Sequence, residues 1–136
     1  MPIAAVVADA DVLLSAVVGK AALRVFTEYG VTVHATEFNA SEVEEYLPRL
    51  ASKYGLPEDL VHLEWRLFPV VLHPQRDYAD RLPAALESLR ERDPEDAHAL
   101  ALAWTLRLPL WSNDRDFEAP EVERYTTAAL LRALER

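Results

Sequence analysis

Four acidic residues occupy positions where predicted strands and helices meet, and carboxylates in such a pattern could hold a divalent cation. Asp9 and Asp114 each follow closely on a short apolar run, and Glu42 and Asp96 each fall in the expected first turn of a helix. Four carboxylates about 6 Å apart would repel one another by roughly 3 kcal/mol per pair at an effective dielectric of about 20. Such a cluster needs protons or a cation, and oxygen ligands without cysteine favour Mg²⁺ or Mn²⁺ over zinc.

Divalent ions held by carboxylates can lower the pKa of a bound water, hold a phosphodiester in line and stabilise charge on the attacking and leaving oxygens. Each acid taken singly also has a structural explanation. Carboxylates in the first turn of a helix stabilise the helix dipole by about 0.3–1 kcal/mol, and aspartates are common in turns. The joint arrangement of the four acids, rather than any one of them, therefore favours a site for a divalent cation.

The segment 93–117 would position two of these acids. Asp93 suits a helix N-cap, Pro94 suits the first helical position, and the alanine- and leucine-rich run that follows has high helix propensity, which places Asp96 in the first turn. A short strand then ends near Ser112, just before Asp114. If that strand joins a parallel sheet, the start of the helix and the end of the strand lie at the same edge.

The rest of the chain alternates strands and helices. The first helix carries Gly19 in its middle, the second has capping-box spacing with Asn39 as the cap and Glu42 three residues on, and Pro83 makes an irregularity in the fourth. Strands are expected at 3–8, 31–35, 68–73, 108–112 and, as a short edge strand, 122–125. The other helices are expected at 11–29, 39–54, 60–66, 77–90 and 126–134, with residues 55–59 as a turn. This alternation predicts an α/β fold with three α/β/α layers around a central, mostly parallel sheet of four to five strands. Right-handed connections then bring all four acids to the carboxyl edge of the sheet, where open α/β sheets bind ligands.

Bulk composition narrows the class of protein. With 136 residues, 51% of them apolar and 27% charged, the chain is expected to form one domain over 1–136. The absence of cysteine excludes disulfides, thiolate catalysis and zinc ribbons, and no segment resembles a signal peptide or a membrane span, so a cytoplasmic location is expected. A net charge of −9 argues against a binder that uses an overall basic surface, but it leaves a locally basic groove open.

Three segments resemble motifs of the PIN domain, a nuclease fold that includes the VapC toxins of bacterial toxin–antitoxin pairs. Residues 6–13 resemble the opening strand and aspartate, residues 96–103 the helix that begins with aspartate, and residues 111–117 the Thr/Ser-x-Asp-x-Asp-Phe segment. The resemblance covers nearly the whole chain and implies a PIN-like three-layer fold. One departure is Asp11, which stands where the family usually has Asn or Thr and could add a carboxylate to the site.

The resemblance implies which acids bind metal. Carried over residue by residue, Asp9, Asp96 and Asp114 are metal-binding acids, with Asp116 as a fourth or outer ligand. Glu42 takes the place of the family's glutamate on the second helix. Ser112 would orient a ligand or a water. Glu44 and Glu45 compete with Glu42 for the glutamate position, and Glu45 is its closer rival.

The function implied is an Mg²⁺- or Mn²⁺-dependent endoribonuclease that forms a homodimer and, if it is a toxin, binds a small antitoxin. Phosphate contacts could come from five arginines, namely Arg24, Arg49, Arg90, Arg92 and Arg115. One alternative is a PIN-like module that has lost activity and binds RNA or a protein. Another is a haloacid-dehalogenase-like phosphatase, whose nucleophile motif resembles residues 9–12; the early positions of Lys20 and Lys53, the only lysines, argue against that class.

Overall fold

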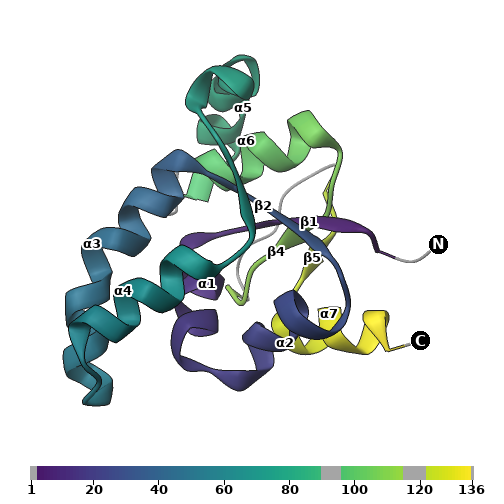
Figure 1. The fold of residues 1–136 in the computed structure, drawn as a ribbon. Coiled ribbons are helices and arrows are strands. Elements are labelled where there is room, and N and C mark those ends of the chain that lie inside the picture. Colours follow the sequence, from purple (N-terminus) through teal and green to yellow (C-terminus); the bar gives the residue numbers. More distant parts are fainter. Residues whose placement is uncertain (1–2, 90–95, 115–121, 136) are drawn as a thin grey trace.

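The computed structural model describes residues 3–89, 96–114 and 122–135. A five-stranded parallel sheet with the strand order β3-β2-β1-β4-β5 runs through its centre (Figure 1). Its strands are β1 (Ala5–Ala8), β2 (Thr32–Thr36), β3 (Val70–His73), β4 (Leu110–Trp111) and β5 (Arg124–Tyr125). The expected parallel sheet, with a short edge strand near residue 125, is confirmed.

Helices cover both faces of the sheet, so the three-layer α/β/α architecture is also confirmed (Figure 1). The helices are α1 (Ala10–Val18), α2 (Lys20–Glu28), α3 (Glu37–Tyr54), α4 (Glu58–Leu67), α5 (Leu82–Ser88), α6 (Asp96–Leu106) and α7 (Thr127–Leu134), with short 3-10 turns η1 (Gln75–Asp77) and η2 (Ala79–Arg81) before α5. Among the described residues no helix is both long and apolar enough to cross a membrane.

The central strand β1 explains why the first apolar run does not alternate with polar residues. Val6 and Ala8 belong to the core beneath α1, α2, α3 and α4, whereas Val7 belongs to the core beneath α5 and α6. Because successive side chains of a strand point to opposite faces, a strand buried on both faces must be apolar at every position. The run ends at Asp9 because the sheet ends there.

The single helix expected at 11–29 is wrong, because Gly19 separates two helices, α1 and α2. Gly19 has extended backbone angles (φ −114°, ψ 154°), and its N–H donates to the Ser15 carbonyl oxygen at 2.6 Å. A Cβ atom at this position would lie 2.8 Å from the same oxygen. The chain therefore leaves the helical conformation at Gly19, where a Cβ atom would clash with the last turn of α1.

The cap expected at Asn39 is also wrong. β2 ends at Thr36, and α3 begins at Glu37 with Thr36 as its N-cap; the Thr36 hydroxyl accepts the Asn39 N–H at 2.9 Å. Glu42 consequently lies in the second turn of α3, not in the first. Threonine in extended conformation at the end of a strand satisfies the helix start three residues before the Asn-x-x-Glu pattern does.

One further expectation changed at a helix start. The helix expected at 77–90 begins with the 3-10 turns η1 and η2 and becomes α-helical only at α5, where Pro83 lies within the first two positions. The expected N-cap Asp93 lies outside the described residues. At the end of the chain, Thr126 caps α7 through its hydroxyl, which accepts the Ala129 N–H at 3.1 Å, as one of the two expected threonines.

Candidate functional site

Asp9 lies between β1 and its neighbour β4 at the carboxyl ends of these strands. It follows β1 directly and N-caps α1, with its Oδ1 accepting the Val12 N–H at 3.0 Å. Its own N–H donates to the Trp111 carbonyl oxygen of β4 at 3.3 Å. Only 6% of Asp9 is exposed, so the fold holds a carboxylate in a nearly closed position.

The burial of Asp9 raises the pKa of its carboxyl from 3.8 to about 6. Hydrogen bonds from the Ser112 hydroxyl and the Val12 N–H lower this pKa, but the nearby charges of Asp11 and Asp114 raise it further. The structure thus brings Asp11, Ser112 and Asp114 close enough to Asp9 to change the pKa of its carboxyl. A carboxylate that is desolvated and faces like charges gains from a cation beside it.

The end of β4 is fixed by the start of α7. The buried Trp111 indole Nε1 donates to Thr127 Oγ1 at 2.9 Å, and Asn113 Oδ1 accepts the Thr127 N–H at 2.8 Å. Between them, the fully buried Ser112 accepts the Asp114 N–H on its Oγ at 3.2 Å. These contacts set the turn that carries Ser112 and Asp114 toward Asp9.

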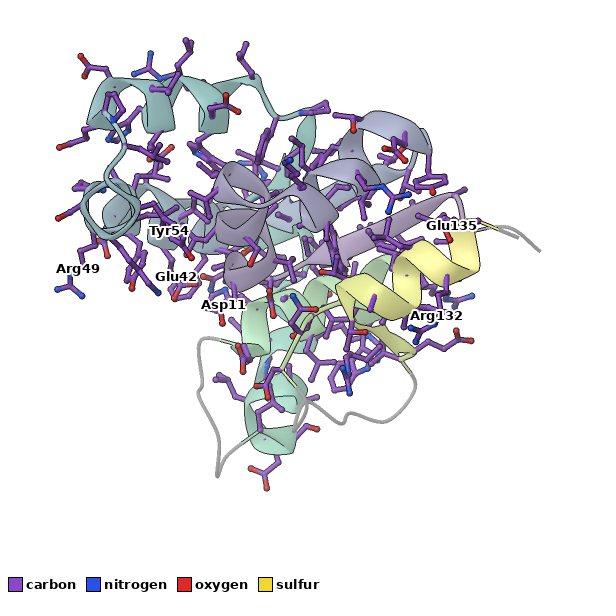
Figure 2. All side chains as sticks on the ribbon, turned by 90° about the horizontal axis from the view of Figure 1, so that it is seen from below. Asp11, Glu42, Arg49, Tyr54, Arg132 and Glu135 are labelled. Atoms are coloured by element: carbon purple, nitrogen blue, oxygen red, sulfur yellow. The ribbon has the colours of Figure 1, made fainter. Side chains whose placement is uncertain are left out.

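Glu42 faces a groove between α1 and α3 with a volume of about 530 Å³. Figure 2 shows Glu42 beside Asp11 on one side of the molecule. The groove is lined by Ala10, Asp11, Leu14, Glu42, Glu45, Tyr46 and Arg49. The groove has an acidic end and a basic end. At the acidic end Asp11 lies close to Asp9. At the basic end, further along α3, the Arg49 guanidinium lies 5.9 Å from the centre of the Tyr46 ring.

Two of the expected phosphate-binding arginines can be compared. Arg24 pairs with Glu28 at 3.0 Å and with Glu135 at 3.1 Å, and Figure 2 shows Glu135 on the other side of the molecule from Glu42. Arg49 instead lines the groove that contains Glu42. The remaining candidates, Arg90, Arg92 and Arg115, lie outside the described residues.

The structure describes most but not all of the predicted metal ligands. Asp96 is half-buried at the start of α6, a helix that packs against β1, β2 and α3. Asp116 lies outside the described residues. Within residues 3–89, 96–114 and 122–135, no group of three or more His, Cys, Asp or Glu side chains is close enough together to hold a metal ion. In the structure Asp11 and Asp114 lie close enough to Asp9 to raise its pKa, and Asp11 and Glu42 line the same groove.

The donor chemistry of these parts fits a hard divalent cation. The donors are carboxylate oxygens with one buried hydroxyl, Ser112, and the buried carboxyl of Asp9 has a raised pKa, mainly because of its burial and also because Asp11 and Asp114 are nearby. Oxygen donors of this kind select Mg²⁺ or Mn²⁺ over softer metals.

Sequence reasoning missed one contact in the site. Asn39, which is 3% exposed, donates from Nδ2 to Glu42 Oε1 at 2.7 Å. The three-residue spacing between Asn39 and Glu42 is also that of a capping box, which is why the sequence predicts a cap at Asn39. Two polar residues three apart on one helix face can instead bond to each other once the helix starts earlier.

Comparison with known proteins assigns the fold to a family. The sequence profile of the PIN domain matches residues 7–135. No curated protein matches the sequence significantly. Among solved structures, a chain of a toxin–antitoxin complex from Klebsiella pneumoniae is similar, with a TM-score of 0.61 and 22% identity over 86% of this chain and 94% of that chain.

This chain belongs to the PIN domain family. PIN domains are generally nucleases, and PIN-domain nucleases typically use divalent metals. The family therefore supports a hydrolase acting on nucleic acid, and it does not support the phosphatase alternative. The Klebsiella chain shares the fold at low identity.

Proposed function

We propose that this protein is an Mg²⁺- or Mn²⁺-dependent endoribonuclease that hydrolyses RNA phosphodiester bonds at the carboxyl edge of its sheet. The observation that carries the proposal is Asp9, a carboxylate buried between β1 and β4 whose pKa is raised to about 6 and whose neighbours Asp11 and Asp114 are also acidic. A purely structural residue at this cap position gains nothing from two negatively charged neighbours. A cation-binding residue does, because the cation compensates the desolvation and the repulsion.

In this proposal Asp9, Glu42, Asp96 and Asp114 would hold the metal, with Asp116 as a further ligand. When bound, the ion supplies Lewis-acid chemistry and neutralises charge on the phosphodiester. The chain's own contribution is positioning: the Val12 N–H fixes Asp9.

The fold also positions two of the residues that follow β4, Ser112 and Asp114. The start of α7 fixes the turn that holds Ser112 and Asp114. The Ser112 hydroxyl, which bonds to Asp9, orients that carboxylate toward its neighbours. Asp9 and Asp114, two of the proposed ligands, are therefore held by the fold before an ion binds, which would reduce the entropy lost on binding.

We further propose that the protein acts in the cytoplasm as a toxin of the VapC type, that it forms a homodimer and that a small antitoxin partner blocks its site. Support comes from the sequence motifs and from the similar Klebsiella chain, which belongs to a toxin–antitoxin complex. Co-expression with the product of a neighbouring short gene, followed by co-purification and loss of RNA cleavage, tests the antitoxin. A nuclease that co-purifies with no small partner and is uninhibited would be a different kind of PIN nuclease.

Cleavage of a labelled single-stranded RNA by the purified protein tests the main proposal. We expect cleavage with Mn²⁺ or Mg²⁺, no cleavage in EDTA, and loss of at least a hundredfold in Asp9→Asn and Asp114→Asn. Asp59→Asn is a matched control, because Asp59 is exposed at the start of α4 and is absent from the groove near Asp9. Full activity of Asp9→Asn, or equal losses in all three variants, would overturn the assignment. Single-stranded DNA of the same sequence shows whether the substrate is RNA.

A second candidate is a PIN-like module that binds RNA or a protein without cleaving. It is favoured by one observation, that the described residues contain no group of three metal-ligating side chains. Thermal unfolding with increasing Mn²⁺ separates the two, since a ligand that binds only the folded state stabilises it. Stabilisation that disappears in Asp9→Asn supports the nuclease, and its absence in the wild type supports the non-catalytic module.

A further inference from the structure

The buried amide of Asn39 makes a short contact with the Glu42 carboxylate. Asn39 Nδ2 lies 2.7 Å from Glu42 Oε1, and only 3% of Asn39 is exposed, whereas Glu42 is half-buried at the groove. We propose that Asn39 is a positioning residue that sets the side-chain conformation of Glu42 and thereby selects it over Glu45 as the glutamate of the site. The inference rests on the proposed metal-dependent function.

The direction of the Asn39 amide is fixed by its neighbours. An ionised carboxylate only accepts hydrogen bonds, so the NH₂ group of Asn39 must face Glu42 and its Oδ1 must face away. On that other side, Oδ1 lies 2.9 Å from the Thr36 hydroxyl, which can donate to it. A flipped amide would place oxygen against oxygen at Glu42, and the observed arrangement is therefore the one in which Asn39 holds a charged Glu42.

Thr36 extends this contact toward α6. Its side chain is fully buried and also hydrogen-bonds Tyr78, and Tyr78 Oη lies 2.7 Å from His98 Nδ1. The Thr36 hydroxyl has a single proton, so at any moment it donates either to Asn39 Oδ1 or to the Tyr78 hydroxyl oxygen. A polar chain therefore runs from Glu42 on α3 to His98 on α6.

The His98 ring also stacks on Phe38 in the first turn of α3, with ring centres 3.9 Å apart and an interplanar angle of 6°. His98 follows Asp96 by two residues, so the same contacts fix the first turn of α6 against the first turn of α3. This series of contacts from Glu42 to His98 thus sets the relative positions of α3 and α6, the two helices that carry Glu42 and Asp96. This is the geometric task that a shared cation site requires, because the two acids come from different helices.

Glu45 lacks such an arrangement. It is exposed at the groove, and among the described residues it makes no hydrogen bond or ion pair. A glutamate without a partner samples several side-chain conformations, and ordering it on a metal costs entropy. For Glu42 this entropy loss is smaller, because Asn39 already restricts its side chain.

The test is Asn39→Leu, a substitution of similar size that removes the amide. The helix cap survives, because the Thr36 hydroxyl is bonded to the backbone N–H of residue 39 and not to its side chain. We expect Mn²⁺ affinity, measured by calorimetric titration of the purified protein, to fall about tenfold, as for other partners of metal ligands. RNA cleavage should show a lower kcat with little change in KM, and saturating Mn²⁺ should restore part of the loss.

Two further variants separate positioning from damage to the fold. Gly55→Ala strains the other end of the same helix, where Gly55 has a φ of 64°, and should leave Mn²⁺ affinity unchanged. On a Glu42→Gln background, Asn39→Leu should cause no further loss of affinity, because both substitutions act through one carboxylate.

Each outcome is decisive. If the wild type binds no Mn²⁺ and cleaves no RNA, the proposed function fails and the positioning role fails with it. If the wild type binds Mn²⁺ but Asn39→Leu binds it equally well, only the role of Asn39 is overturned. The same holds if the loss persists in the Glu42→Gln background. Asn39→Ala, which leaves space for a water, gives a second reading should the leucine variant fold poorly.

Discussion

Replacing Asp9 by asparagine should make the metal-free protein more stable while abolishing its activity. The pKa of Asp9 is raised from 3.8 to about 6, mainly by burial. At about 1.36 kcal/mol per pKa unit, keeping this carboxylate ionised costs the folded state about 3 kcal/mol above pH 6. Asparagine has nearly the same shape, carries no charge, and can still accept the Val12 N–H through its Oδ1.

The sign of the pH dependence follows from the direction of the shift. The folded pKa of Asp9 lies above the unfolded value, so between about pH 4 and pH 6 the folded wild type binds more protons than the unfolded chain. Wild-type stability should fall as the pH rises through that window, relative to Asp9→Asn. The advantage of the variant is therefore largest at pH 7 to 8 and disappears below about pH 4.

Urea unfolding of both proteins in EDTA, followed by circular dichroism between pH 4 and pH 8, measures this difference. All other titratable groups are common to the two proteins, so the pH dependence of the difference isolates Asp9. The 3 kcal/mol is an upper value, since the Ser112 hydroxyl bonds better to a carboxylate than to an amide. In melting temperature it corresponds to at most roughly 10 °C for a domain of this size.

The reasoning would be refuted by a variant that is less stable than the wild type at pH 8, or by a stability difference that does not change with pH. Either result would mean that the carboxylate is adequately solvated or compensated in the metal-free protein. Addition of Mn²⁺ should reverse the order, because only the wild type gains stability from binding.

Three other predictions concern the fold around the site. Gly19→Ala should destabilise the protein by about 1–3 kcal/mol in urea unfolding, because its Cβ would meet the Ser15 carbonyl 2.8 Å away; an unchanged midpoint would mean that the turn between α1 and α2 yields easily. Thr126→Ala removes the hydroxyl cap of α7 and should cost about 1 kcal/mol, a loss that Thr126→Ser should largely prevent. The pKa of His34 is lowered from 6.5 by burial and by His73, whose Nε2 lies 2.9 Å from its Nδ1. Wild-type stability should therefore fall, relative to His34→Gln, as the pH drops below about 6.5; parallel pH profiles would contradict this.

Much of the fold could be predicted because it depends on local patterns. The uninterrupted apolar run of β1 requires a strand buried on both faces, and alternation with helices then requires parallel pairing. Asp9 at the end of that run and Asp114 after the fourth strand could be assigned to one edge for the same reason, and the effect of Asp114 on the pKa of Asp9 agrees with this.

Helix starts were less predictable, because several residues can satisfy the same backbone groups. Asn39 and Thr36 are both good N-caps, and the choice between them depends on how far β2 extends in pairing with β3. In the structure Thr36 is the last residue of β2 and pairs with His73, so the helix starts directly after it. Likewise Gly19 could be tolerated within a helix by propensity alone, and only its extended backbone conformation in the folded chain makes it a boundary.

The sequence by itself therefore determined the class of fold, the family motifs and the acidic residues from which a site could be built. Tertiary structure decided how those acids are tuned. It buried Asp9 enough to raise its pKa to about 6, placed Asp11 between Asp9 and the groove of Glu42, and gave Glu42 a buried partner in Asn39. Desolvation and hydrogen-bond partners depend on which distant segments pack around a side chain, and no local pattern in the chain encodes them.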